Sequence, residues 1–254
     1  PEIYTLSLHD ALPIWVKAVA LACARKNIPI RIGVNGGSLE KPILAKYGGV
    51  TPQALVESAF GHIALLNRYD FDEICISLKS SSVPVTMGAY QLMHQQADYP
   101  LHLGVTEAGT VRMGTLKSAA GIGGLLALGI GDTLRVTLTA DPVEEIYAAR
   151  DILKAIGLRR EGPDLIACPT CGRTKIDLIP LAQAVEERLK TVTKPITVAV
   201  MGCPVNGPGE AAAADVGIAG GNGKGLLFRH GEVLKQVPQE ELLDELMALI
   251  DQLP

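Results

Sequence analysis

The sequence has few aromatic residues, no long apolar run and no large excess of either charge. Only 4% of its 254 residues are Phe, Trp or Tyr. Charged residues or glycines interrupt every apolar segment before the roughly 18 residues that a membrane-spanning helix needs. The formal net charge of -4 gives no broad basic field, which disfavours a nucleic-acid duplex as partner and leaves small anionic substrates open. We therefore expect a soluble protein with neither membrane nor nucleic acid as partner.

The chain does have ample apolar material and five cysteines. Hydrophobic residues make up 48% of it, enough for one large core or for a medium core with a small appended domain. Five cysteines in a chain of this size favour a reducing, cytoplasmic compartment, where thiols bind metals or fill cores. We expect Cys23 and Cys75 to be core fillers, because they lie in an Ala-rich helical segment and an apolar strand.

Residues 28 to about 157 repeat a short apolar strand, a polar or Gly-rich turn and an amphipathic helix. This pattern is typical of βα units with buried parallel strands. We expect strands at 28–35, 73–79, 101–106 and 133–139, and helices at 51–68, 84–97, 110–128 and 141–156. Four units fit either an open doubly wound sheet or half of the eight units that close a barrel.

The pattern changes after Gly157. A charged linker at 158–164 precedes a smaller α/β segment, with a helix expected at 176–190, a strand at 196–200, a hairpin at 226–237 and a terminal helix at 238–252. We place a domain boundary at the linker, which gives a substrate domain at 15–160 and a small domain at 161–254. Residues 1–14 lack an initiator Met and join a helix abruptly, so we interpret them as a non-native leader.

Three cysteines and one glutamate form the most informative pattern. They stand in Cys168-Pro-Thr-Cys171-Gly-Arg and Met-Gly-Cys203-Pro-Val-Asn-Gly-Pro-Gly-Glu210. A structural zinc site or an electron-carrying cluster normally has four Cys or His ligands, so a set one thiolate short leaves a metal ion open to chemistry. The turn at 206–209 can bring Glu210 to the same point, as a ligand that iron exchanges for a substrate oxygen. The alternative for Glu210 is a solvated acid in the first turn of a helix.

The cysteine spacing alone leaves other sites open. Cys-Pro-x-Cys-Gly also matches one knuckle of a zinc ribbon, although only Cys203 is available for a second knuckle. A thioredoxin-type redox pair is disfavoured, because the strand-to-helix setting is not evident. Two alternative functions follow: a zinc-dependent hydrolase with three cysteines and a water on the metal, or an inactive fragment whose cluster is purely structural.

Ionisable and polar residues gather near the expected strand ends. Parallel α/β folds place their active sites at the carboxyl ends of the strands. An inward arginine in an apolar strand needs an anion to offset its desolvation, and a diphosphate would serve. Taken singly, each residue has an ordinary surface or ion-paired role as its alternative, which comes first for a lone histidine. In chain order these residues are Arg31, Asn35, Lys79, His102, Glu107, Arg135 and Thr137.

Six motifs in order resemble the hydroxymethylbutenyl diphosphate synthase family (IspG, also called GcpE) of the methylerythritol phosphate isoprenoid pathway. Two are the cysteine motifs. The other four are Ile30-Arg-Ile-Gly-Val-Asn35, Ile76-Ser-Leu-Lys79, Leu101-His-Leu-Gly-Val-Thr-Glu107 and Gly129-Ile-Gly-Asp-Thr-Leu-Arg135. The resemblance runs from about Val16 to the C-terminus.

The resemblance implies an α/β fold, the C-terminal half of a TIM-type barrel followed by a small [4Fe-4S] cluster domain. It implies that 2-C-methyl-D-erythritol 2,4-cyclodiphosphate is opened and dehydroxylated to 4-hydroxy-3-methylbut-2-enyl diphosphate, with two electrons from ferredoxin or flavodoxin. Glu107 would then be the acid that assists C–O cleavage. The implied cluster ligands are Cys168, Cys171, Cys203 and Glu210, and the implied diphosphate and hydroxyl contacts are Arg31, Asn35, Lys79 and Thr137.

The family also implies a head-to-tail homodimer, in which the cluster domain of one subunit covers the barrel of the other. This chain has Thr137 where many members have serine, which keeps the hydroxyl. By the same resemblance, we expect the first barrel strands of the family to be missing from this sequence. We therefore expect the fragment neither to close its barrel nor to turn over, and its full-length parent to do both.

Overall fold

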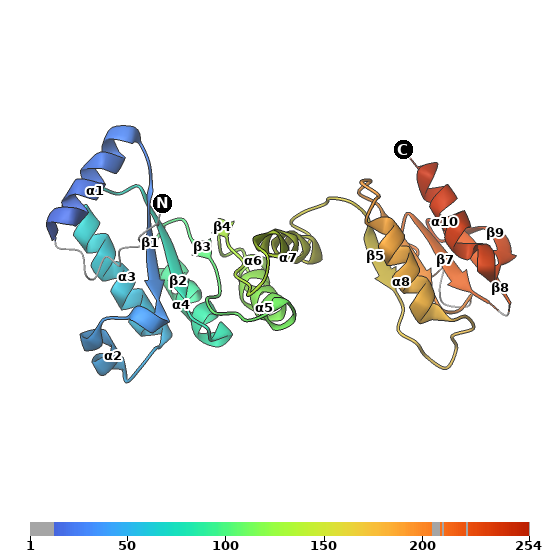
Figure 1. Cartoon of the computed structure of the whole chain (residues 1–254), viewed down its shortest axis with the longest axis horizontal. Helices are drawn as coiled ribbons and strands as arrows, with labels where there is room; N and C mark the ends of the chain where they lie inside the picture. Colours follow the sequence, from blue (N-terminus) through green and yellow to red (C-terminus); the bar gives the residue numbers. More distant parts are fainter. Residues whose placement is uncertain (1–12, 205–208, 210, 222, 254) are drawn as a thin grey trace. The chain divides into compact units, whose positions relative to one another are not determined.

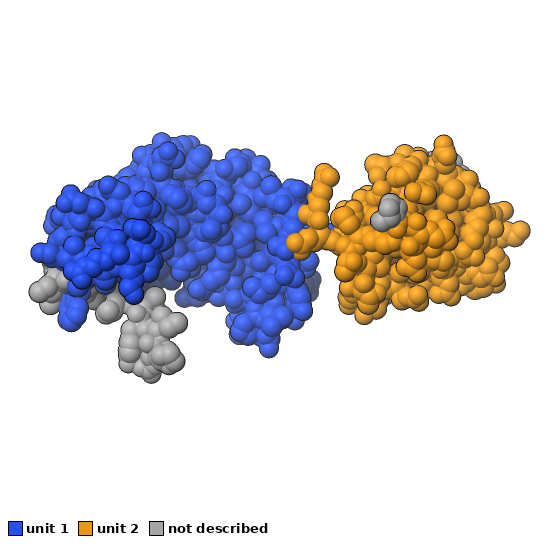
Figure 2. All heavy atoms as spheres, turned by 90° about the horizontal axis from the view of Figure 1, so that it is seen from above, with its two compact units in different colours: residues 1–159 blue, residues 160–254 orange. Residues whose placement is uncertain are grey.

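The computed structural model describes residues 13–204, 209, 211–221 and 223–253. The chain divides into two compact units, Pro1–Arg159 and Arg160–Pro254 (Figure 2). Each unit contains its own cluster of buried hydrophobic side chains. The two units are therefore described one at a time.

Unit 1 alternates helices and parallel strands along the chain (Figure 1). Its elements are α1 (Pro13–Lys26), β1 (Ile30–Asn35), η1 (Gly36–Ser38), α2 (Lys41–Tyr47), α3 (Pro52–Asn67), β2 (Ile74–Lys79), α4 (Val83–Gln96), β3 (His102–Leu103), α5 (Val111–Ser118), η2 (Ala119–Gly123), α6 (Gly124–Ala127), β4 (Thr133–Leu134) and α7 (Pro142–Ala155).

Local capping explains where two of these helices begin. The Thr51 side chain accepts a 3.1 Å hydrogen bond from the Ala54 N–H at the start of α3, and the Asp141 side chain accepts one of 2.9 Å from Val143 at the start of α7. Both caps are followed by a proline at the first helical position, where its missing N–H has no cost. Helix α2 was not predicted from the sequence.

The strands of unit 1 are parallel and follow chain order. β1 pairs with β2 from Ile30 opposite Ile74 to Asn35 opposite Lys79, a single bridge joins Ile76 to Leu101, and β3 pairs with β4. The expected strands at 101–106 and 133–139 shorten to two residues each, because regular pairing ends where both chains enter loops. Within the part of the chain that the structure describes, these strands form an open array and no closed barrel.

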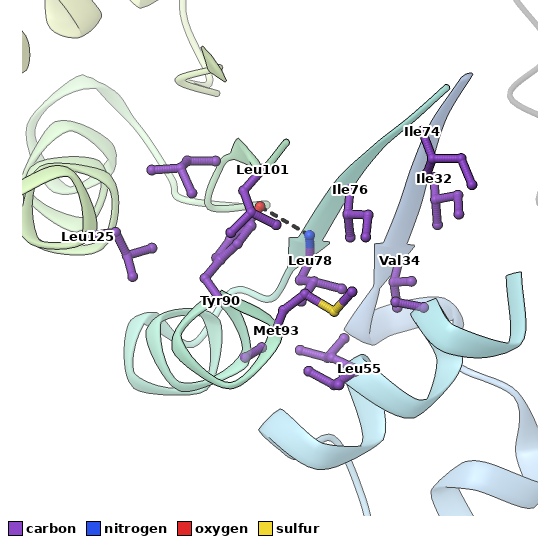
Figure 3. Close-up of a cluster of buried hydrophobic side chains, with 14 of the residues drawn as sticks. Ile32, Val34, Leu55, Ile74, Ile76, Leu78, Tyr90, Met93, Leu101 and Leu125 are labelled. Carbon is purple, nitrogen blue, oxygen red and sulfur yellow. Dashed lines mark hydrogen bonds between the residues drawn. The ribbon is translucent and has the colours of Figure 1, made fainter. Parts of the chain in front are cut away.

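The β1–β2 pair has one apolar and one polar face. Ile32, Val34, Ile76 and Leu78 are buried against α3 and α4, which supply Leu55 and Met93 to the same core (Figure 3). The alternate residues of the strands occupy the opposite face, since successive side chains of a strand point to opposite sides. That polar face carries Arg31, Gly33 and Asn35 from β1 and Cys75, Ser77 and Lys79 from β2.

Unit 2 is a mixed five-stranded sheet with helices packed on it (Figure 1). Its strand order is β5-β6-β7-β8-β9, parallel from β5 to β7 and antiparallel from β7 to β9. Side chains of α8 and α10 share a core with β6 and β7. The elements are β5 (Asp164–Ala167), α8 (Leu178–Leu189), β6 (Thr197–Met201), β7 (Val216–Gly220), β8 (Lys224–Arg229), β9 (Glu232–Pro238), η3 (Gln239–Glu241) and α10 (Leu242–Asp251).

Two strands of unit 2 were missed by the sequence prediction. β5 begins at Asp164, the last residue of the expected linker, and β7 lies in a stretch interpreted as a Gly-rich loop. The glycines of β7 serve close packing instead. A Cβ at Gly217 would lie 2.3 Å from the Phe228 ring, and one at Gly220 would lie 2.5 Å from the Ile176 side chain. Glycine is required there because a neighbouring side chain fills the space.

In the part of the chain that the structure describes, every helix is too short or too polar to cross a bilayer.

Candidate active site and cysteine centre

The carboxyl ends of β1 and β2 bring two polar side chains together. Asn35 and Lys79 are the last residues of their strands and are directly paired, and both are half-buried. The Asn35 Oδ1 accepts a 3.1 Å hydrogen bond from the Gly37 N–H, which fixes the turn that follows β1. Lys79 therefore stands at a defined edge of the sheet, the edge where parallel folds place their sites.

The Lys79 side chain runs across Gly104, the residue after β3. A Cβ on Gly104 would lie 3.3 Å from Lys79 Cε and 3.2 Å from the Arg135 carbonyl oxygen. Because Gly104 has no side chain, the Lys79 side chain has room to extend across the end of β3. In the segment that follows β4, Arg135 Nε donates a 3.3 Å hydrogen bond to the Thr137 hydroxyl. Lys79, Arg135 and Thr137 therefore belong to one region of the polar face.

Four ionisable groups near this face, Arg31, Lys79, His102 and Arg135, interact electrostatically. Burial, followed by the charges of Arg135 and Arg31, lowers the pKa of Lys79 to about 8. Burial, followed by the charges of Arg31, Lys79 and Arg135, lowers the pKa of His102 to about 4. Because neighbouring cations contribute to both shifts in addition to burial, Arg31, Lys79 and Arg135 lie close enough to repel one another. A bound polyanion would relieve this repulsion.

His102 is buried, with 8% of its surface exposed, and is neutral near pH 7. Its Nδ1 lies 2.8 Å from the Thr133 hydroxyl, across the β3–β4 pair. Its Nε2 is buried and has no hydrogen-bond partner among the described residues. A buried nitrogen of this kind normally has a partner, so it marks a position where a polar group of a ligand or a water is expected.

Two predicted site residues lie elsewhere than expected. Arg31 was expected at the end of its strand, but it is the second residue of β1 and lies opposite Cys75, at a lower level than Asn35. Two-residue alternation predicts which face of the sheet a side chain occupies, but it does not predict how far along the strand the residue lies. Glu107 lies exposed in the loop after β3, with φ of 51°, a left-handed conformation that non-glycine residues seldom adopt. Such backbone strain is common at functional sites.

In unit 2 the first and third cysteines of the motifs follow neighbouring strands. Cys168 comes directly after β5, and Cys203 comes two residues after β6 ends at Met201. The two strands are parallel and paired. The Gly202 N–H donates a 3.0 Å hydrogen bond to Cys168 Sγ. This bond links the two cysteine loops at one edge of the sheet.

Cys171 has its own set of donors. Its thiol pKa is lowered by a hydrogen bond from the Arg173 backbone N–H and then by one from the Thr174 side chain. The Thr174 hydroxyl accepts a 3.1 Å hydrogen bond from the Cys171 N–H and lies 4.0 Å from Cys171 Sγ. Donors aimed at sulfur stabilise the thiolate, which is the metal-binding form.

The sulfur donors of this centre fit a thiophilic metal or cluster. Within the ranges that the structure describes, no group of three or more His, Cys, Asp or Glu side chains is close enough to hold a metal ion. Glu210 lies outside the described residues. The set Cys168, Cys171, Cys203 and Glu210 therefore remains a prediction.

Comparison with known proteins gives the same family for both units. Residues 13–150 match the model described as GcpE TIM-barrel domain, and residues 164–252 match the GcpE protein C-terminal domain. The chain belongs to the GcpE family. The resemblance predicted from six motifs is thus confirmed, as is a mixed α/β fold made of part of a TIM-barrel domain and a second domain.

Three relatives of this GcpE-family chain are named 4-hydroxy-3-methylbut-2-en-1-yl diphosphate synthase (flavodoxin). The chain is 60% identical over 236 residues to the protein of Clostridium perfringens, covering 93% of itself and 68% of that protein. It is 58% identical over 238 residues to that of Caldanaerobacter subterraneus, covering 94% and 67%. It is 56% identical over 238 residues to that of Geobacter sulfurreducens, covering 94% and 67%.

Several residues that shape these sites in the GcpE-family chain were not predicted from the sequence. Gly104 and Gly202 resemble loop glycines, and Thr174 resembles an ordinary turn residue. Cys75 was expected to be a core filler, and burial does raise its pKa, but it lies on the polar face opposite Arg31.

Proposed function

We propose that this chain has the activity that its relatives are named for, the synthesis of 4-hydroxy-3-methylbut-2-enyl diphosphate. The substrate would be 2-C-methyl-D-erythritol 2,4-cyclodiphosphate, which is opened and dehydroxylated with two electrons. The observation that carries the proposal is the cationic region of Arg31, Lys79 and Arg135, whose mutual repulsion suits a diphosphate. The zinc-hydrolase alternative is not favoured, because the relatives are named synthases that use flavodoxin.

In this proposal, different residues of the site bind different groups of the substrate. Lys79, Arg31 and Arg135 bind the diphosphate oxygens, and arginine does so with two parallel N–H groups. Asn35, Thr137 and His102 bind neutral oxygens of the substrate. Glu107 donates the proton with which the cleaved hydroxyl leaves as water, from an exposed loop position next to the strand that carries His102.

The cysteine loops would hold a [4Fe-4S] cluster. Its protein ligands in our proposal are Cys168, Cys171, Cys203 and Glu210, and the cluster, when bound, supplies the electrons of the reduction. Two contacts support this assignment: the Gly202 N–H donates a hydrogen bond to Cys168 Sγ, and the Arg173 N–H lowers the pKa of the Cys171 thiol. The carboxylate of Glu210 is the ligand most readily exchanged.

We further propose the electron donor, the assembly and the location. Flavodoxin is the donor that the relatives' names give, with ferredoxin as the alternative. The family resemblance supports a head-to-tail homodimer. Free thiols at Cys168, Cys171 and Cys203 support a reducing cytoplasm, where such ligands stay available.

Anaerobic purification with metal analysis tests the cluster. We expect a brown protein with broad visible absorption and about four irons and four sulfides per chain. A colourless protein with one zinc would overturn the assignment. The substrate site is tested separately, by calorimetric titration of the cyclic diphosphate into the same sample. Binding that survives Lys79→Met unchanged would remove Lys79 from the site.

A further inference from the structure

The pairing between β2 and β3 is interrupted by a side chain. The Ile76 N–H donates a 2.8 Å hydrogen bond to the Pro100 carbonyl, and Ile76 bridges to Leu101. In a parallel ladder of this register, the next bond would run from the Leu78 N–H to the His102 carbonyl. Instead, the Leu78 N–H donates to the Tyr90 hydroxyl at 3.0 Å, and that hydroxyl donates to the His102 carbonyl at 2.6 Å.

Tyr90 reaches this position from α4, on the apolar side of the sheet (Figure 3). Its side chain is fully buried, and burial raises the pKa of Tyr90 to about 12, so the hydroxyl stays protonated and can serve both strands. Two hydrogen bonds in series now span a distance that one bond covers in a regular ladder. The hydroxyl therefore acts as a spacer that holds β2 and β3 apart at this level.

The spacer lies close to the proposed binding site along both strands. Leu78 directly precedes Lys79, and His102 precedes Gly104 by two residues. The Lys79 stem crosses from β2 over Gly104 toward β4. The distance between β2 and β3 therefore sets how far the Lys79 ammonium extends toward Arg135.

We propose that Tyr90 is a positioning residue for Lys79: its hydroxyl, inserted between β2 and β3, sets the spacing at which Lys79 and Arg135 bind the same diphosphate. The inference rests on the proposed function, because it takes the diphosphate as the ligand of these two cations. Tyr90 contacts no substrate in this account. It acts through the backbone of Leu78 and His102, and a side chain without the hydroxyl cannot replace it.

The test is a double-mutant cycle between Tyr90 and Lys79, with inorganic pyrophosphate as the probe. Affinity is measured by calorimetry on the whole chain, in the unchanged protein and in Y90F, K79M and the double variant. We expect Y90F to weaken binding about tenfold when Lys79 is present, and by less than about twofold in the K79M background, since the lost interaction acts through that side chain. Equal losses in both backgrounds would overturn the inference, as would unchanged affinity in folded Y90F.

A matched control separates positioning from general loss of core packing. Met93→Leu alters another fully buried side chain of the same helix without touching a hydroxyl, and it should leave pyrophosphate affinity unchanged. A tenfold loss in M93L would count against a specific role of the hydroxyl. If Y90F unfolds, the titrations are repeated with trimethylamine N-oxide, which favours the compact state. Absence of pyrophosphate binding in the unchanged protein would instead contradict the proposed function.

Discussion

The Gly202 N–H donates a 3.0 Å hydrogen bond to Cys168 Sγ, so the loop after β6 is attached to the sulfur that follows β5. The Thr174 side chain packs on the same glycine, and a Cβ at position 202 would lie 3.0 Å from its hydroxyl and 3.2 Å from Leu178. The Lys175 N–H also donates to the Gly202 carbonyl at 2.9 Å. Gly202 is therefore the point at which both cysteine loops meet.

Gly202→Ala should reduce cluster binding. The added methyl group meets Thr174 and Leu178, so the Gly202 backbone must shift, and its N–H is the donor to Cys168 Sγ. Loss of such supporting contacts typically costs about 10- to 100-fold in metal affinity. Iron per chain after anaerobic reconstitution is the measurement. Gly172→Ala is the control, because nothing lies within 4 Å of a Cβ at that glycine. Equal iron content in both variants would contradict this role of Gly202.

Thr174→Val should shift the midpoint potential of the bound cluster to lower values. The hydroxyl lies 4.0 Å from Cys171 Sγ, and donors to the sulfur ligands stabilise the more negative, reduced state. Valine keeps the shape and removes the hydroxyl, whereas Thr174→Ser keeps the hydroxyl and should retain the potential. A potentiometric titration followed by electron paramagnetic resonance measures the effect. Identical potentials in the valine and serine variants would show that the hydroxyl plays no part.

Lys79→Met should raise the thermal stability of unit 1 near pH 7. The pKa of Lys79 falls from its ordinary 10.5 to about 8 in the folded protein, mainly through burial. The unfolded chain then binds more protons between about pH 8 and 10.5, so the lysine costs stability below pH 8 and the cost disappears as the pH rises through that window. Melting temperatures at pH 7 and pH 10.5 measure the difference. A gain of the same size at both values would exclude the lysine charge as its cause.

His102→Gln should reduce the loss of unfolding free energy that the protein shows as the pH falls from 7 to 4. The pKa of His102 falls from 6.5 to about 4 on folding, first through burial and then through Arg31, Lys79 and Arg135. The neutral ring therefore favours folding above about pH 6.5, and this contribution is lost as the pH falls toward 4. Chemical unfolding between pH 4 and 7 measures it. His94→Gln, at an exposed position on α4, should leave that loss unchanged, and a reduced loss in that variant would contradict the assignment.

In unit 1, sequence patterns predicted the sheet face of each residue better than its position along the strand. Asn35 and Lys79 stand at strand ends as two-residue alternation and strand length predict, whereas Arg31 lies four residues earlier on the same face. Two-residue alternation does not predict the position of a residue along its strand. The spacer at Tyr90 could not be predicted, because it depends on how a helix residue meets two strands that are separate in sequence.

In unit 2 the cysteine motifs fall in loops that follow strands β5 and β6, but the strands of this unit were harder to identify from the sequence. β7 contains Gly217 and Gly220, and glycine in a strand is ordinarily read as a turn. These glycines are explained by the Phe228 and Ile176 side chains, which occupy the space that a Cβ at Gly217 or Gly220 would need. Both side chains come from outside β7. The predicted ligand Glu210 lies outside the described residues, so its role rests on the motif alone.

The crowding of Arg31, Lys79 and Arg135 on one face has a consequence for the lifetime of the protein in the cell. Three cations that oppose one another make the empty unit easier to open, and an anion that binds only the folded form stabilises it by mass action. Proteases attack the opened form. The amount of this protein in a cell should therefore follow the supply of its diphosphate, with scarcity shortening its half-life and abundance extending it.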